Sequence, residues 1–289
     1  MPPETPGQRD GYRLHPCIDE AIRHVRGQSE GPPLPNGVPV TLNFHPDALH
    51  QGRLMIEILA REGIYRTQFE TGTSNGGLTA HPGGERWLWE SRMFGTAYDN
   101  ADPELRPRYG ALNYLRRATG GSPRFGSAHL RLRPHVLART TFCYPDSHLD
   151  PVDFGVADRM GLIALAEKGR ALADMLDRYV EAHVHGPLIL TDDVDAIVLD
   201  PSYRDTGIEA AARTLPFPVE WHPGFRMPVS RVEDCVAYRG QEVADLAASI
   251  AEGGYVTPRE IGFARRSDKA DPQSIKQAWH CVARFGSPE

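Results

Sequence analysis

The feature that most constrains the fold is a polar, glycine-rich segment at residues 70–84, with the sequence ETGTSNGGLTAHPGG. It has no apolar periodicity, and its glycines interrupt any regular element. A loop of this length inside a compact domain is uncommon unless it has a function. We therefore expect the segment to belong to a binding or catalytic site that regular elements support on both sides.

The composition is that of a globular protein. Of the 289 residues, 40% are hydrophobic and 24% are charged, which is enough apolar material for a substantial core. The net charge of -6 does not favour a nucleic-acid partner, which usually requires a basic face. No apolar run reaches the ~20 residues that a membrane span needs, so we expect no membrane partner.

The four cysteines lie far apart in the sequence and form no CxxC pair, so neither a zinc knuckle nor a disulfide framework is expected. The N-terminal residues lack the apolar core of a signal peptide. Both observations favour reduced thiols and a cytoplasmic location. Secretion as an effector by a route that recognises no such peptide stays open.

Periodicity and turn signals predict a mixed α+β fold. We expect an N-terminal helix and linker over residues 1–37 and a single α+β catalytic domain over residues 38–289. The predicted helices cover residues 17–26, 49–62, 85–98 and 161–183, and a last helix begins at Asp271. The predicted strands cover residues 39–44, 64–69, 108–113, 125–133, 196–200 and 219–222.

The predicted binding site follows from the chemistry of the polar loop. Arg66 can hold a phosphate or carboxylate with a bidentate fork, and successive backbone N–H groups at glycines can form an anion nest. We expect a phosphate-bearing ligand, although neither of the familiar glycine-rich nucleotide motifs is present. The alternative is a surface loop whose glycines serve turns only. The predicted binding residues are Arg66, Gln68, Thr71, Gly72, Thr73, Ser74, Asn75, Gly76, Gly77, His81 and Ser127.

Four residues are candidates for catalysis: His45, Arg66, Glu70 and Glu220. On a strand, Gln68 and Glu70 would point to the same face beside the loop, where a carboxylate could stabilise positive charge. The alternative is that Glu70 only pairs with Arg66. His45 follows a predicted strand and either orients a ribose hydroxyl or lies at a helix entry. Glu220 lies beside Trp221 in a late strand.

Two further residues carry expectations about burial. Ser127 lies on the polar face of the predicted strand at residues 125–133, and that face either lines a cleft or contacts solvent. Glu90 lies on the apolar face of a predicted helix, so we expect a buried carboxylate with a raised pKa.

Several sequence blocks resemble a bacterial family catalogued as a domain of unknown function. The resemblance extends over nearly the whole chain, from about residue 43 to residue 286. The blocks are LNFHPD (42–47), YRTQFETGTSNGGLTAHPGGERWLWE (65–90), RPRYGALN (106–113), GGSPRFGSAHLRL (120–132), VEWHPGF (219–225) and KQAWHCVARFG (276–286).

At a second level, the chain resembles the ADP-ribosyltransferase superfamily. Members hold NAD in a split, mixed sheet with flanking helices. They use an Arg or His on an early strand, a Ser, Thr or Tyr in the middle and a late Glu. The resemblance implies His45 or Arg66 for the first role, Ser74 or Ser127 for the second, and Glu70 or Glu220 for the third. Glu70 comes too early for this order, and the order Arg66, Ser127, Glu220 lacks the usual Ser-Thr-Ser motif.

The function implied is transfer of ADP-ribose from NAD to an acceptor, which we expect to be a protein, with no metal required. Two alternatives remain. A metal-assisted hydrolase would use pairs such as His183 with His185 or Asp146 with His148, or the acidic run Asp192, Asp193 and Asp195. A non-catalytic module would bind a nucleotide or peptide through the same polar loop.

Overall fold

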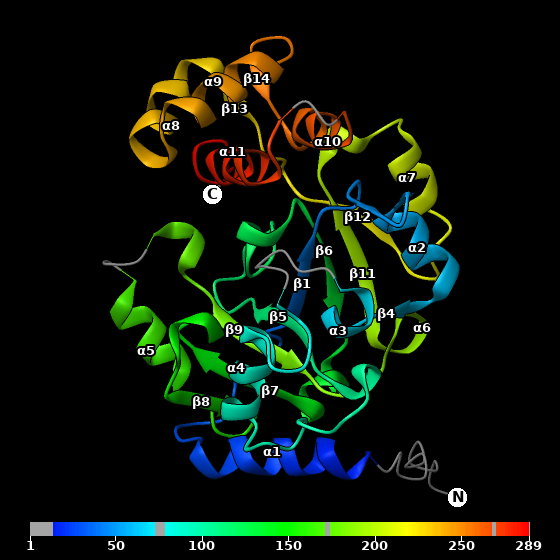
Figure 1. The fold of residues 1–289 in the computed structure, drawn as a ribbon, viewed down its shortest axis with the longest axis vertical. Coiled ribbons are helices and arrows are strands. Elements are labelled where there is room, and N and C mark those ends of the chain that lie inside the picture. The colour runs from blue at the N-terminus through cyan, green and yellow to red at the C-terminus, as the bar shows by residue number, and fades with distance from the viewer. Residues whose placement is uncertain (1–13, 73–78, 171–173, 268–269, 289) are drawn as a thin grey trace, which may run out of the picture.

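The computed structural model describes residues 14–72, 79–170, 174–267 and 270–288. It is a mixed α+β fold with one large sheet and flanking helices (Figure 1). Thr73, Ser74, Asn75, Gly76 and Gly77 of the predicted binding loop lie outside the described residues. No helix of the described ranges combines the length and the apolar character needed to cross a membrane.

The large sheet has eight strands, and all but one pair of neighbours are antiparallel. The parallel pair is β11 with β12 at one edge. In spatial order the strands are β12 (Val219–Trp221), β11 (Val194–Leu199), β6 (Ala128–Leu132), β1 (Val40–Phe44), β5 (Arg108–Leu112), β9 (Val180–Val184), β7 (Thr140–Tyr144) and β8 (Asp153–Val156).

The sheet diverges between β1 and β5. Their pairing covers only Val40 with Leu112 and Thr41 with Ala111, whereas Leu42, Asn43 and Phe44 pair with β6 alone. A Cβ atom at Gly110 would lie 2.7 Å from the Thr41 carbonyl oxygen, so a glycine is needed where β5 passes close to β1. The two strands separate beyond this point.

Helices cover the sheet and its two ends. In Figure 1, α1 (Pro16–Gln28) lies at one end and the C-terminal helices lie at the other. The remaining helices are α2 (Met55–Glu62), α3 (Gln68–Thr71), α4 (Glu85–Met93), α5 (Leu162–Gly169), α6 (Leu190–Asp193), α7 (Gly207–Ala212), α8 (Val232–Arg239), α9 (Gln241–Ile250), α10 (Pro258–Arg266) and α11 (Pro272–Phe285). Three two-stranded sheets are β2 (Leu49–His50) with β3 (Arg53–Leu54), β4 (Ile64–Tyr65) with β10 (Leu188–Ile189), and β13 (Met227–Pro228) with β14 (Tyr255–Val256).

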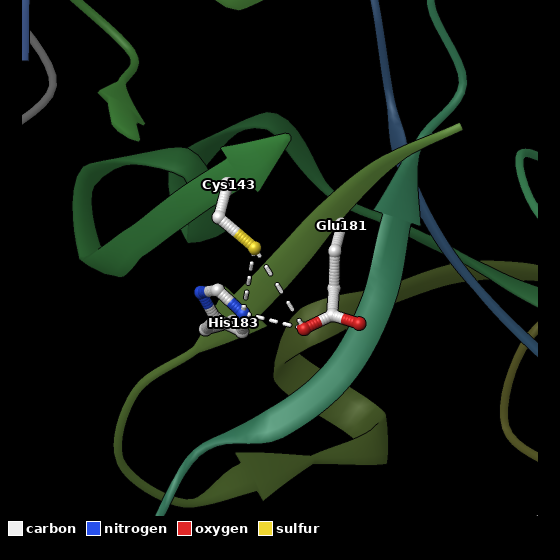
Figure 2. A group of neighbouring side chains, drawn as sticks. All are labelled: Cys143, Glu181 and His183. Atoms are coloured by element: carbon white, nitrogen blue, oxygen red, sulfur yellow. Dashed lines mark hydrogen bonds and ion pairs between the residues drawn. The ribbon is translucent and has the colours of Figure 1, made fainter. Parts of the chain in front are cut away.

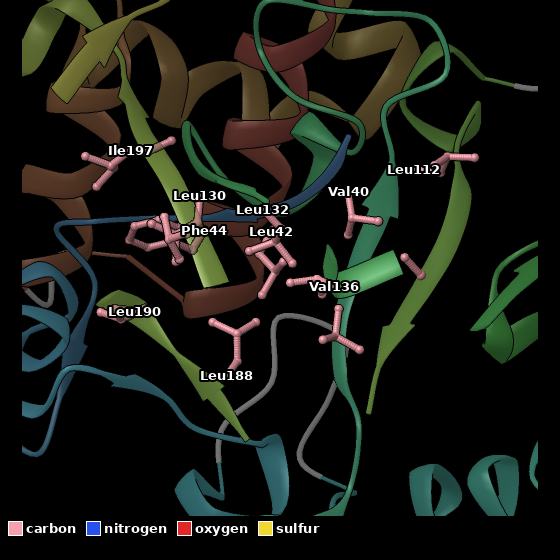
Figure 3. Close-up of a cluster of buried hydrophobic side chains, with 14 of the residues drawn as sticks. Val40, Leu42, Phe44, Leu112, Leu130, Leu132, Val136, Leu188, Leu190 and Ile197 are labelled. Atoms are coloured by element: carbon pink, nitrogen blue, oxygen red, sulfur yellow. The ribbon is translucent and has the colours of Figure 1, made fainter. Parts of the chain in front are cut away.

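The main core lies against one face of the sheet and contains alternate residues of the strands, such as Leu42, Leu130 and Ile197 (Figure 3). A second core joins α8–α11 around Trp279. The Trp279 indole N–H donates to the carbonyl oxygens of Pro123 and Arg124, each at 3.1 Å. These bonds attach the C-terminal helices to the loop that precedes β6.

The prediction of a helix over residues 161–183 is wrong in its C-terminal part. The helix α5 ends at Gly169, and Val180–Val184 form β9 between β5 and β7. The sequence VEAHV alternates apolar and polar residues with a period of two, which is the strand pattern. The apolar content of the segment led to the helix prediction, although its phase was that of a strand.

The predicted strand at residues 64–69 is also wrong in its second half. The strand β4 ends at Tyr65, and Gln68–Thr71 form the short helix α3. Thr67 and Glu70 form a capping box, in which the Thr67 hydroxyl accepts from the Glu70 N–H and the Glu70 carboxylate accepts from the Thr67 N–H. Gln68 and Glu70 therefore do not share a strand face.

Other predictions are confirmed with shifted ends. The helix predicted at residues 49–62 begins only at Met55, because residues 49–54 form the β2–β3 hairpin, and the one predicted at residues 85–98 ends at Met93. The strands predicted at residues 108–113 and 219–222, and the last helix with Asp271 as its N-cap, are present.

Candidate active site

Two cavities share part of their walls. The outer groove has a volume of about 510 Å³ and is lined mainly by residues 44–71. The inner cleft has a volume of about 300 Å³, and its charged lining residues are Arg86, Arg124, Asp146, His148, Glu181 and Lys276. Tyr65, Gln68 and Tyr109 line both cavities. The groove therefore adjoins the cleft along these three side chains.

The outer groove contains five of the predicted site residues, namely His45, Arg66, Gln68, Glu70 and Thr71. Glu70 already has its partners here. Its carboxylate accepts from the Thr67 N–H at 2.8 Å, from Arg66 at 3.3 Å and from Arg108 at 3.5 Å. This is the structural role that the sequence left open as the alternative to catalysis.

Arg66 lies at the rim of the groove and its side chain is 46% exposed. It donates to Glu62 at 2.7 Å as well as to Glu70. These two carboxylates compete with any anionic ligand for the same guanidinium group.

His45 is buried in the wall of the groove. Its ring makes an edge contact with Trp279 at a centroid distance of 5.0 Å. Burial, with Arg265 and His280 nearby, holds the pKa of His45 well below its usual range. The imidazole is therefore neutral at physiological pH.

Among the described residues, three other predicted ones, Gly72, His81 and Ser127, line neither cavity. Ser127 is fully buried and shares a hydrogen bond of 3.2 Å with the Tyr203 hydroxyl. Gly72 is the left-handed C-cap of α3, with a φ of 62°. The exposed His81 lines neither cavity, and its Nδ1 lies 3.2 Å from the Pro82 carbonyl oxygen.

Glu220 lies on the edge strand β12, where Arg131 donates to both of its carboxylate oxygens at 2.6 and 2.7 Å. Arg131 also donates to Asp195 at 2.7 Å, so the three side chains join β6, β11 and β12. Five strand spacings separate β12 from β9, which is roughly 24 Å at about 4.8 Å per strand. The structure therefore does not bring Glu220 to the inner cleft.

The inner cleft lies where β1 and β5 diverge. Asn43 of β1 holds the loop that precedes β6, because its Nδ2 donates to the carbonyl oxygens of Thr119 and Gly126 and its Oδ1 accepts from the Ser122 N–H. Ser122, Arg124 and Phe125 of this loop line the cleft. The divergence of the sheet thus creates the site, and the loop forms part of its wall.

Glu181 of β9 is the buried carboxylate of the cleft, with 6% exposure. Its Oε1 lies 2.9 Å from Nε2 of His183 and 3.9 Å from Sγ of Cys143 (Figure 2). Glu181 is absent from the predicted site residues because the helix predicted over residues 161–183 contains it. The alternation of apolar and polar residues from Val180 to His185 was the signal that could have identified it.

Arg86 is the buried cation of the cleft, with 8% exposure. Its guanidinium carbon lies 4.4 Å from the ring centroid of Tyr109 and 5.2 Å from that of Trp89. Its Nη1 is buried and has no hydrogen-bond partner among the described residues. A buried guanidinium N–H without a partner is costly, so this atom is suited to donate a hydrogen bond to an anionic or carbonyl ligand.

A buried network supports the cleft from below. Arg106 donates to the fully buried Glu90 at 2.6 Å, and the Tyr109 hydroxyl donates to the other Glu90 oxygen at 2.8 Å. Burial raises the pKa of Glu90, which confirms the expectation from its place on an apolar helix face. This network fixes the ring of Tyr109, on which Arg86 stacks.

Within the described residues, the metal ligands considered from the sequence do not by themselves form a group of three. Asp192 and Asp195 are exposed, and Asp146 is hydrogen-bonded to His148 at 2.7 Å. His183 instead meets Cys143 and Glu181, and the three donor atoms lie within 4.8 Å of one another. The spacing of these three residues in the sequence gives no signal of this group.

Comparison with curated proteins finds no match. A protein family described as "Protein of unknown function (DUF3626)" matches residues 39–168 and 162–283. These two segments include β1, β5 and β9 and the cleft that lies at their divergence. Since the matches extend over most of the chain, the protein belongs to the DUF3626 family.

Proposed function

We propose that the inner cleft binds NAD, that Glu181 assists cleavage of the bond between nicotinamide and ribose, and that the ADP-ribosyl group passes to an acceptor, which we expect to be a protein. The observation that carries the proposal is the pair of buried, oppositely charged groups in the cleft, Glu181 and Arg86. NAD presents a developing positive charge at the ribose and a negative pyrophosphate, which are the complements of these two groups.

The strand order also supports this assignment. The superfamily resemblance implies functional residues on an early strand, a middle strand and a late strand, the last being a Glu. Asn43 of β1, Tyr109 of β5 and Glu181 of β9 line the cleft in that order. Asn43 departs from the Arg or His of the pattern, because its amide holds the loop before β6. Glu181 takes the late position in place of Glu70 and Glu220.

The cations around the cleft suit the pyrophosphate. Arg86 has an unpartnered N–H, and Lys276 of α11 has no ion-pair partner among the residues described. Burial lowers the pKa of Lys276, and a bound phosphate would offset that effect by stabilising the charged amine. Arg124 already pairs with Asp177 at 2.5 Å, so we assign it a smaller share of the binding.

The proposed role of Glu181 follows from the positive charge that develops on the ribose during the reaction. As the C1′–N bond breaks, its electron pair passes to nicotinamide and the ribose acquires oxocarbenium character. A carboxylate that is fixed in a site of low dielectric stabilises this charge without reorganisation. Glu181 is held in this way by His183. The acceptor's lone pair then forms the new bond to C1′ and the acceptor loses its proton.

The aromatic side chains and the cavity volumes indicate which part of the reaction each cavity holds. Trp89, Tyr109 and Phe125 line the inner cleft and supply aromatic contacts for nicotinamide beside the Arg86 guanidinium. A volume of about 300 Å³ is at the low end for ligand sites, and it suits the reacting half of NAD. The outer groove adjoins the cleft at Tyr65 and Gln68, so we assign the approach of the acceptor to the groove.

Calorimetry with NAD, followed by chromatography for released nicotinamide, tests the proposal. Wild-type protein should bind NAD and release nicotinamide. Glu181→Gln should still bind NAD but release nicotinamide about 1,000-fold more slowly, because the stabilising charge is lost. Glu220→Gln is the matched control and should release nicotinamide at the wild-type rate.

Two outcomes would contradict the proposal in different ways. If wild-type protein binds NAD but releases no nicotinamide, the cleft belongs to a non-catalytic binding module. If it binds no NAD at millimolar concentration, the ligand is a different one and metal-assisted hydrolysis becomes the next reaction to test.

A further inference from the structure

Two adjacent strands bring a thiol, a carboxylate and an imidazole together behind the wall of the inner cleft. Cys143 of β7 is the direct cross-strand partner of Glu181 of β9, and His183 follows Glu181 by two residues on the same face. Figure 2 shows the three side chains converging. Their exposures are 0%, 6% and 1%, so the group is shielded from bulk water.

The spacings of the donor atoms are within about 0.4 Å of those in a zinc site. Sγ of Cys143 lies 3.9 Å from Oε1 of Glu181 and 3.8 Å from Nε2 of His183, and the Nε2–Oε1 distance is 2.9 Å. Zinc bonds of about 2.0–2.3 Å at tetrahedral angles place donor atoms about 3.3–3.8 Å apart. The Nε2–Oε1 distance must widen by about 0.4 Å, and the two sulfur distances must shorten by about 0.3 Å, because sulfur and a nitrogen or oxygen donor lie about 3.5 Å apart around zinc.

The donor types select the class of ion. Thiolate, imidazole and carboxylate together are a ligand set for zinc and its neighbours in the first transition row. Calcium and magnesium prefer oxygen donors, so they do not match this group. With three protein ligands, a fourth position remains for water.

A chain of buried hydrogen bonds orients the imidazole for this role. His183 Nδ1 lies 3.3 Å from the Thr141 hydroxyl, which lies 2.8 Å from Nε2 of His185. His185 Nδ1 in turn lies 2.7 Å from the Tyr98 hydroxyl. Metal-bound histidines almost always have such a partner on the second ring nitrogen.

This chain accommodates the change of His183 tautomer without moving the heavy atoms of Thr141, His185 or Tyr98. The protons of this hydrogen-bond chain have two arrangements. In one, His183 carries its proton on Nε2 and donates to Glu181. In the other, His183 Nδ1 donates to Thr141, Thr141 donates to His185, and His185 donates to Tyr98. The second arrangement has the same number of protons and leaves Nε2 of His183 free to bind a metal. The Cys143 S–H bond then breaks as the sulfur–metal bond forms, and its proton goes to solvent.

We propose that Cys143, Glu181 and His183 bind a divalent cation of the zinc class, and that the bound ion withdraws the Glu181 carboxylate from the inner cleft and inhibits the reaction there. The first half of this proposal stands independently of the NAD chemistry. The second half rests on the proposed function, because inhibition requires that Glu181 be the reacting carboxylate.

The binding half is tested on full-length, chelator-treated protein with Zn²⁺ in equilibrium dialysis and with Co²⁺ as a spectroscopic probe. Wild-type protein should bind a single Zn²⁺ with low-micromolar affinity or tighter and should show the near-ultraviolet band of a thiolate–Co²⁺ bond. Cys143→Ser should weaken Zn²⁺ binding by about 100-fold and abolish the band, and Thr141→Val should weaken it by about tenfold. Cys281→Ser, at another fully buried cysteine, is the control and should keep both.

The absence of the Co²⁺ band in wild-type protein would overturn the binding half, even if a variant failed to fold. Equal Zn²⁺ binding by wild-type and Cys143→Ser would overturn it as well. For the inhibition half, Zn²⁺ should suppress nicotinamide release by the wild type, whereas the activity that Cys143→Ser retains should not fall when Zn²⁺ is added. Zn²⁺ binding by a protein that does not cleave NAD would contradict the proposed function alone, and cleavage by a protein that binds no Zn²⁺ would contradict the metal site alone.

Discussion

The outer groove and the inner cleft contain similar side chains, but these are paired differently. In the groove, Arg66 already contacts two carboxylates, and Glu70 accepts from a helix N-terminus and two arginines. In the cleft, Arg86 has a buried N–H without a partner among the described residues. Polar groups that satisfy one another stabilise a fold, whereas a buried group that lacks a partner is available to a ligand.

The largest expected difference between the two regions concerns stability. Glu90→Gln should reduce the free energy of unfolding by about 3–5 kcal/mol, because it leaves the Arg106 charge buried without its counter-charge below the cleft. Glu62→Gln in the groove removes a partner from Arg61 and Arg66, both near half exposed, and should reduce it by at most about 1 kcal/mol. Urea unfolding measures both values.

The double variant Glu90→Met with Arg106→Met tests the reason for this difference. Removing both charges should recover most of the stability that Glu90→Gln loses, since no uncompensated charge remains. If Glu90→Gln and Glu62→Gln reduce stability equally, then burial does not distinguish the two sets of ion pairs.

The next difference concerns ligand affinity. Arg86→Met should weaken NAD binding by about 10–100-fold, the effect of losing a charge-assisted hydrogen bond in a buried site. Arg66→Met should change it by less than about threefold, because Glu62 and Glu70 already occupy the guanidinium group. Calorimetry on both variants, with circular dichroism as a control for folding, makes the comparison. The opposite result would place the pyrophosphate in the groove.

A smaller effect is expected at the carboxylate that the sequence favoured. Glu70→Gln should reduce the free energy of unfolding by about 1 kcal/mol, because the capping box on Thr67 and the pairing with Arg108 are weakened. Nicotinamide release should stay within about twofold of wild type in the same preparation, in contrast to the ~1,000-fold loss expected for Glu181→Gln. A loss at Glu70 as large as that at Glu181 would return catalysis to the groove.

The sequence identified the groove more readily than the cleft for a physical reason. Arg66, Gln68, Glu70 and Thr71 are neighbours in the chain, so a local pattern of polar and glycine residues reveals them. The cleft combines a helix residue such as Arg86 with Glu181 and Lys276, which are far apart in the sequence. No local sequence pattern predicts that these three residues lie together, because their proximity depends on the order of the strands in the sheet.

The fold was predictable to a similar, local extent. The mixed α+β class, the strand at Arg108 and the Asp271 cap followed from periodicity and from cap chemistry. The strand β9 was missed, although its alternation was visible, because the apolar residues before it led to the prediction of one long helix. That error removed Glu181 from the candidates. Glu181 and His183 face the same way only on a strand, and Cys143 meets them only when β9 pairs with β7.

The smallest expected effect depends on pH and concerns the exposed rim of the cleft. The hydrogen bond to Asp146 raises the pKa of His148, so the folded state favours the protonated imidazole. Its contribution to stability is therefore fully present below the ordinary histidine pKa of about 6.5 and is lost as the pH rises through the higher folded value. Because His148 is 53% exposed, the contribution should stay below about 1 kcal/mol. Thermal unfolding of wild type and His148→Gln should differ more at about pH 5 than at about pH 9. The difference should disappear at both pH values in an Asp146→Asn background, and its persistence there would show that His148 is stabilised by a different partner.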